Sequence, residues 1–133
     1  MSGLVDSIEN TILDAILGNA TYMPNPVYIG LMTAEPDDDG TGVVEPSGGA
    51  YARISVANNL TQWPAASGGQ KSNANVIQFA TATAAWGIIT HYGIFDAVSS
   101  GNLLAFGALD SSRDVQSSDT FSFLATTFVV ALD

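Results

Sequence analysis

The feature that most constrains the fold is a series of short segments after Pro26 that are rich in β-branched and aromatic residues. Turn-forming residues separate these segments at the spacing typical of antiparallel sandwiches. Apolar and polar residues alternate within 52–56 and 121–123, as expected for strands that bury one face. The predicted strands are 27–34, 51–57, 75–81, 88–97, 102–110, 119–124 and 127–132. The sequence therefore predicts a mainly β fold, an antiparallel β-sandwich, over residues 27–133.

Residues 2–18 have a helical period instead. Apolar residues recur there at helical spacing, and polar residues fall on the opposite side. The apolar side consists of Leu4, Val5, Ile8, Ile12, Ala15 and Ile16. Asp6 and Glu9 suit the positive end of the helix dipole, and Gly18 with Asn19 supplies a stop. We predict one N-terminal amphipathic α-helix, a helical arm on a single domain of residues 1–133.

Leu13 and Leu17 do not fit this pattern, because they project toward the polar side of the helix, one turn apart. They could belong to a wide buried stripe. Alternatively, paired apolar residues on a polar face suit docking into a groove of a partner. The pattern leaves open whether the helix packs on its own sandwich or on a neighbouring subunit.

The charge of the chain is strongly acidic, with 13 Asp and Glu residues against 3 Lys and Arg. The cations Arg53, Lys71 and Arg113 are scattered along the sequence. Phosphate binding needs several clustered cations, so we expect no nucleic-acid partner and no anionic membrane partner. A surface that faces DNA would be repelled. In any assembly that contains DNA, the chain should therefore lie on the outside.

The surface is also poor in charge. Charged residues make up 12% of the chain, and the usual share in a soluble domain is about a quarter. Either partners cover part of the surface, or the surface is rich in Ser, Thr and Asn. There is no cysteine, and acids interrupt the N-terminal apolar residues, so the sequence predicts neither a disulfide framework nor a signal peptide. We expect a chain made in the cytoplasm.

Two long loops stand out, since loops of about 15 residues are usually functional or mobile. The loop 35–49 carries Asp37, Asp38 and Asp39, which suggests either a calcium site or a solvated acidic turn. An EF-hand loop needs a glutamate where this one has Gly48, so we predict no metal. The loop 58–73 presents Trp63 before a proline, either as an interface residue or as a residue that pins the loop.

The sequence contains no recognisable catalytic pattern. His91 is the only histidine, and Asp96 lies five positions on, which places the two on opposite faces of a strand. No G-x-S-x-G elbow, P-loop or Rossmann fingerprint is present. Trp86 lies among small residues, as expected for a core anchor. We predict a protein that is not an enzyme and has no cofactor.

Several motifs in combination resemble a known family. They are VYIGLMTAEP, SGGAYARISVANN, WPAASGGQKSN, ATATAAWGIITHYGIFDA and GNLLAFGAL, and they span nearly the whole chain. The combination resembles a widespread family of small phage virion proteins often labelled tail-fibre or tail-fibre-like. That family is similar to jelly-roll cement proteins, which clasp capsid subunits in some short-tailed phages. The resemblance implies a jelly-roll-like sandwich in the virion and brings no catalytic residues.

A virion role leaves two locations to consider. A fibre shaft needs repeats or a trimeric coil, and neither is present in this sequence. A compact acidic sandwich suits a capsid cement protein bound to the major capsid protein on the outer surface of the head. The alternative is a tail-fibre or tail-tip component that contacts tail proteins or a host receptor. In either location we expect a homo-oligomer, a dimer or trimer. The predicted partner contacts are Leu13, Leu17, Asp37, Asp38, Asp39 and Trp63.

Overall fold

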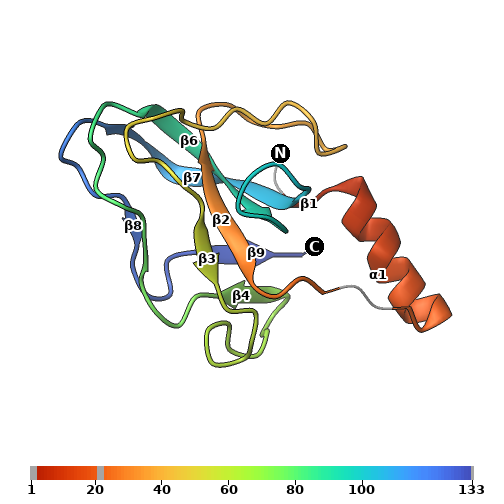
Figure 1. Cartoon of the computed structure of the whole chain (residues 1–133). Helices are drawn as coiled ribbons and strands as arrows, with labels where there is room; N and C mark the ends of the chain where they lie inside the picture. The colour runs from red at the N-terminus through yellow and green to blue at the C-terminus, as the bar shows by residue number, and fades with distance from the viewer. Residues whose placement is uncertain (1–2, 21–22, 133) are drawn as a thin grey trace.

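The computed structural model describes residues 3–20 and 23–132, which form an antiparallel β-sandwich with one helix near the N-terminus (Figure 1). The elements are β1 (Gly3–Leu4), α1 (Asp6–Gly18), β2 (Val27–Met32), β3 (Ile54–Val56), β4 (Gln70–Ser72), β5 (Ile77–Gln78), β6 (Gly87–Phe95), β7 (Leu103–Val115), β8 (Ser122–Phe123) and β9 (Val129–Ala131). The predicted fold class is confirmed: the protein is mainly β, antiparallel, with a single N-terminal helix.

The larger layer is a five-stranded sheet in the order β1-β7-β6-β2-β3, in which every neighbouring pair is antiparallel. Two short strand pairs, β4-β9 and β5-β8, supply the opposing layer. The main core lies between the layers and is rich in aromatic side chains. Its buried members include Val27, Ile29, Leu31, Val56, Ile77, Phe79, Trp86, Ile89, Phe121, Phe123 and Phe128.

The strand β2 has buried side chains on both faces of the sheet. Val27, Ile29 and Leu31 point into the main core, whereas Met32 points to the other face. There Met32 packs with Val5, Phe95, Leu103 and Phe106 in a second cluster. The start of α1 and the loop 35–49 cover this cluster with Ile8 and Val43. Because both faces are covered, β2 is apolar nearly throughout instead of alternating.

The helix is shorter at its N-terminal end than predicted. It begins at Asp6, and Gly3 and Leu4 instead pair with Phe106 and Ala105 at the edge of the sheet. Ser2, which the predicted helix included, lies outside the described residues. Hydrogen bonding to β7 outweighs local helix propensity here, which the period of the sequence cannot reveal. The predicted stop is confirmed, because Asn19 caps the helix in the left-handed conformation with φ of 52°.

Strand boundaries also differ from the predictions. The loop 58–73 contains β4, which exists because it pairs with β9. The polar end of β7 continues to Val115, where residues 113–115 pair with the start of β6. The turn between β6 and β7 is closed by the N–H of Asp96, which donates to the carbonyl of Asn102 (3.2 Å). Both missed stretches are polar, so only long-range pairing defines them.

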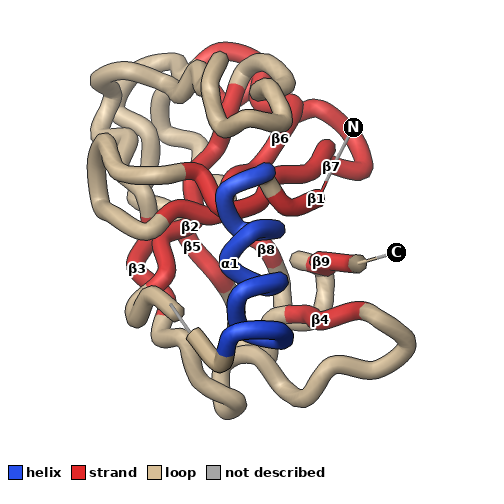
Figure 2. Tube along the Cα trace, turned by 90° about the vertical axis from the view of Figure 1, so that its right-hand side faces the viewer, coloured by secondary structure: helices blue, strands red, loops and turns tan. Residues whose placement is uncertain are grey.

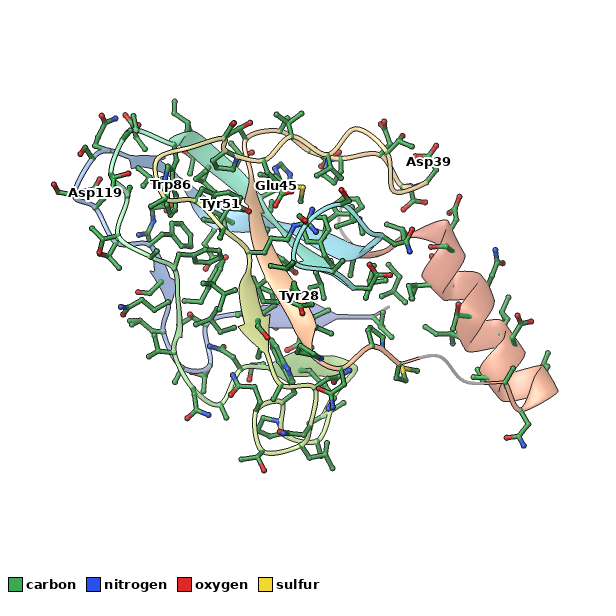
Figure 3. All side chains as sticks on the ribbon, viewed as in Figure 1. Tyr28, Asp39, Glu45, Tyr51, Trp86 and Asp119 are labelled. Atoms are coloured by element: carbon green, nitrogen blue, oxygen red, sulfur yellow. The ribbon has the colours of Figure 1, made fainter. Side chains whose placement is uncertain are left out.

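A buried ion pair fixes the acidic loop to the sandwich. The guanidinium of Arg53 donates to both carboxylate oxygens of Glu45, at 3.0 Å from Nε and 2.7 Å from Nη2. Its third nitrogen donates to the carbonyls of Ala97 and Ser100, at 2.8 and 2.9 Å. Glu45 also accepts the hydroxyl of Tyr51 at 2.6 Å, and the two side chains meet beside β2 in Figure 3. One arginine thus joins three separate segments of the chain.

The ring of Phe95 completes this arrangement. The guanidinium carbon of Arg53 lies 3.5 Å from the centroid of that ring. On the sheet side the ring covers two glycines that pair across β2 and β6, Gly30 and Gly93. A Cβ at Gly30 would stand 2.8 Å from both the Phe95 ring and a Glu45 carboxylate oxygen. Glycine is therefore required for the ion pair to lie this close to the backbone.

Replacing Arg53 by alanine should destabilise the protein strongly. Arg53 is only 8% exposed, and its loss would leave the Glu45 carboxylate buried without its cation. Breaking a buried pair in this way costs about 3–5 kcal/mol. Urea unfolding followed by tryptophan fluorescence measures the change. The control Arg113→Ala removes an exposed arginine of β7 and should shift stability by no more than about 0.5 kcal/mol. Equal effects of the two substitutions would contradict a special role for Arg53.

Gly30→Ala should also lower the free energy of unfolding, by about 1–3 kcal/mol, because the added methyl group overpacks the site. Gly18→Ala is the matched control, since a Cβ there meets nothing within 4 Å. At the end of α1 alanine should be neutral or slightly stabilising. Thermal unfolding of both variants checks the difference, and a Gly30→Ala protein as stable as the wild type would refute the close approach.

Candidate docking surface

Among the described residues, α1 makes its closest contacts with the sandwich at its N-terminal end. Val5 is buried just before the helix, and its N–H donates to the carbonyl of Leu104 (3.0 Å). Ile8 packs on the second cluster, but no residue of α1 itself is fully buried. Figures 1 and 2 show the helix standing at one side of the sandwich, away from the five-stranded sheet over most of its length.

The apolar side chains of α1 become more exposed toward its C-terminal end. Ile8 and Ile12 are half-buried, whereas Ile16, one turn further along the same side, is 70% exposed. Leu13 and Leu17 are 55% and 84% exposed, so they do not form part of a buried stripe. We call Leu13, Ile16 and Leu17 the helix stripe. It lies exposed to solvent in the isolated chain.

An apolar groove runs between α1 and the open end of the sandwich. Its volume is about 640 Å³, and residues from both layers and from the helix line it. They include Leu4, Ile12, Leu60, Trp63, Ile94 and Leu132. Leu60 and Leu132 are themselves more than half exposed, which extends the apolar surface beyond the groove. Ile12 lines the groove, and the helix stripe lies on the same helix, α1. The helix therefore links the two.

Trp63, one of the predicted contacts, is mostly buried. It is 8% exposed, its indole N–H donates to the carbonyl of Ala57 (3.1 Å), and its ring lies 5.7 Å from that of Phe128. Trp63 therefore pins the loop 58–73 to the main core and also contributes to the groove. The prediction that Trp86 is a core anchor is confirmed, since it is 4% exposed and donates to the carbonyl of Gly49 at 2.8 Å.

The acidic residues of the loop 35–49 form an ordered turn. The side chain of Asp39 accepts both the N–H and the hydroxyl of Thr41, at 3.0 and 2.6 Å, and these hydrogen bonds lower the pKa of Asp39. Asp37 closes the turn through its N–H, which donates to the carbonyl of Thr41 (2.9 Å). Asp39 projects outward at the tip of the loop in Figure 3.

This turn touches the start of α1. The N–H of Asp6 donates to the carbonyl of Asp38 (3.1 Å). Desolvation, followed by the negative charge of Asp6, raises the pKa of Asp38 above its ordinary value. The structure thus brings the helix and the acidic loop together, two of the three predicted contact regions. The third, Trp63, lines the groove together with Ile12 of the helix.

The polar groups considered for metal binding or catalysis have other partners. Within residues 3–20 and 23–132, no three His, Cys, Asp or Glu side chains gather in a way that could hold a metal ion. The Nε2 of His91 lies 3.4 Å from Glu35, and its Nδ1 lies 2.8 Å from the hydroxyl of Thr90. Asp96 instead accepts two hydrogen bonds from Asn102. In the same part of the chain, no helix has the length and apolarity needed to cross a membrane.

Sequence reasoning missed part of this surface. Ile16 was expected to be buried with the rest of the apolar side, and Leu60 and Leu132 carried no distinguishing pattern. Their exposure depends on how far α1 diverges from the sandwich, which helical period alone cannot show. Leu13 and Leu17 were recognisable because they break the amphipathic pattern.

The protein is thus a β-sandwich that exposes apolar and acidic side chains on and beside α1. The family model for the podophage GP4 fiber I protein gp80 matches residues 3–131, nearly the full chain. The protein therefore belongs to this family of phage fibre proteins, and the predicted family resemblance is confirmed. No curated protein matches the sequence significantly.

The contact between the helix and the acidic loop can be tested by titration. Asp6→Asn removes the negative charge beside Asp38, so the pKa of Asp38 should fall toward its ordinary value, while desolvation keeps it somewhat raised. Because a raised carboxyl pKa makes the fold less stable as pH rises through it, the variant should lose less stability there. Carboxyl ¹³C NMR titration measures the pKa. Asp14→Asn, more than two turns further along α1, is the control and should leave the pKa of Asp38 unchanged.

Proposed function

We propose that this chain is a non-enzymatic structural subunit on the outside of a phage particle, attached to another virion protein through its α1 side. The family match over residues 3–131 is the observation that carries this proposal. The apolar groove and the helix stripe supply the contact area that such an attachment needs. The net charge of −10 supports a position away from packaged DNA.

The family description favours a position in a fibre of the tail. A single sandwich of this size has no shaft of its own, so the chain would serve as a tip, a cap or an adaptor between a fibre and its attachment point. Its partners there would be tail proteins, and several copies would assemble around the symmetry axis of the fibre or the tail.

A capsid cement role is the second candidate, favoured by the rigid sandwich and the acidic outer charge. In that role the chain would bind the major capsid protein at subunit junctions and stabilise the expanded shell, because a ligand that binds only one state shifts the equilibrium toward it. Many weak contacts repeated by symmetry would combine into strong attachment. A homo-oligomer, a dimer or trimer, is compatible with either location.

Immunogold electron microscopy of intact virions, with an antibody raised against this chain, distinguishes the locations. We expect the label at the tail end of the particle, in the small number of copies that a fibre requires. Label spread evenly over the head would establish the cement role instead. Absence of the chain from purified virions, checked by mass spectrometry, would overturn the proposal as a whole.

A further inference from the structure

The groove and the helix stripe both involve α1, and the described residues leave the helix stripe exposed. Ile12 and Leu132 line the groove, and Leu13, Ile16 and Leu17 lie exposed further along α1. A helix of 13 residues is marginally stable in water without packing along its apolar side. Both observations indicate that α1 acquires its full set of contacts from another molecule.

The charged side chains of α1 and of the turn beside its first residue have one sign. The charged side chains of α1 are Asp6, Glu9 and Asp14, and no basic residue lies in its last turn. The turn that touches the start of the helix adds Asp37, Asp38 and Asp39. Lys71 is a cation in the groove lining, but its ammonium donates to the carbonyl of Trp63 at 3.1 Å inside the loop. The exposed side of α1 and the turn at its start are therefore acidic, and we call these side chains the acidic rim.

These charges argue against a second copy of the chain as the occupant. If two copies packed their α1 surfaces on each other, both would contribute the same acidic side chains, and like charges across an interface are unfavourable. The C-terminal end of α1 adds the negative end of the helix dipole to this repulsion. A partner with basic residues would be attracted instead of repelled. The charge therefore favours a basic partner over a second copy of the chain.

We propose that the groove beside α1 binds an amphipathic helix of a different protein, with its apolar side chains in the groove and Lys or Arg residues along the acidic rim. Two helices pack with axes about 8–10 Å apart, so such a helix would lie alongside α1 and cover the helix stripe. Helix-in-groove docking relies on apolar anchors for affinity, and the charged rim selects the partner. This inference rests on the proposed function, since it names the partner chemistry of the same surface.

A pair of synthetic helical peptides tests the proposal. Both carry the same leucine stripe, flanked by lysines in one peptide and by glutamates in the other. We expect the lysine peptide to shift the NMR signals of the Trp63 indole N–H and of the Leu13, Ile16 and Leu17 methyl groups, and its affinity to fall at least tenfold between 50 and 500 mM NaCl. Equal shifts with the glutamate peptide, or none with the lysine peptide, would overturn the proposal.

The double variant Leu13→Ser/Leu17→Ser should bind the lysine peptide at least tenfold more weakly, because it removes apolar contacts without disturbing the core. The matched control is Val76→Ser/Leu124→Ser, which changes two exposed apolar residues beside β5 and β8 and should keep the affinity of the wild type. Sedimentation of the chain alone completes the test. A dimer that the Leu13/Leu17 variant dissociates would identify a second copy as the occupant and reject a basic partner.

Binding of the chain to phage particles tests this inference separately from the proposed function. Virions assembled without the chain are incubated with the wild-type protein or with the Leu13→Ser/Leu17→Ser variant, and the bound protein is quantified after sedimentation. Binding of the wild type and at least tenfold weaker binding of the variant supports both. Equal binding of the two proteins rejects the α1 surface but keeps the virion role. The virion role itself is rejected if the wild-type protein does not bind these particles and if normally assembled virions contain none of the chain.

Discussion

The buried pair of Arg53 and Glu45 is the interaction on which the rest of the structure depends. Removing two charges from water is costly, and the protein offsets that cost with four hydrogen bonds from the guanidinium and a ring beneath it. The pair holds the loop 35–49 over the second face of the sheet. That loop covers the cluster around Phe106 and meets the first turn of α1. The orientation of the helix therefore depends on a contact far from it in sequence.

The attachment of α1 at one end has a physical consequence for binding. Its first turn is fixed by Val5, Ile8 and the loop, whereas its last turns expose the helix stripe. A partner that fills the groove would bury Ile16 and its neighbours and so stabilise the helix together with the complex. The rigid sandwich positions this surface, and the acidic rim restricts what can bind to it.

Prediction from sequence succeeded where local pattern and tertiary structure agree. The run of β-branched and aromatic segments predicted the sandwich, and Asn19 predicted the end of the helix. It failed for β1, β4 and the polar end of β7, which exist only through pairing with distant strands. For the docking surface, the misfit of Leu13 and Leu17 was visible in the pattern, but the exposure of Ile16 was not.

The sequence by itself determined the fold class, the acidic charge, and the family, because these follow from composition, period and motifs that are local in the chain. Only the tertiary structure decided which apolar residues remain exposed, that the acidic turn contacts the start of α1, and that Trp63 lines a groove with Ile12. Exposure is a property of packing between distant segments. The Arg53–Glu45 pair shows this most directly, since nothing in the neighbouring sequence indicates that these two charges are buried together.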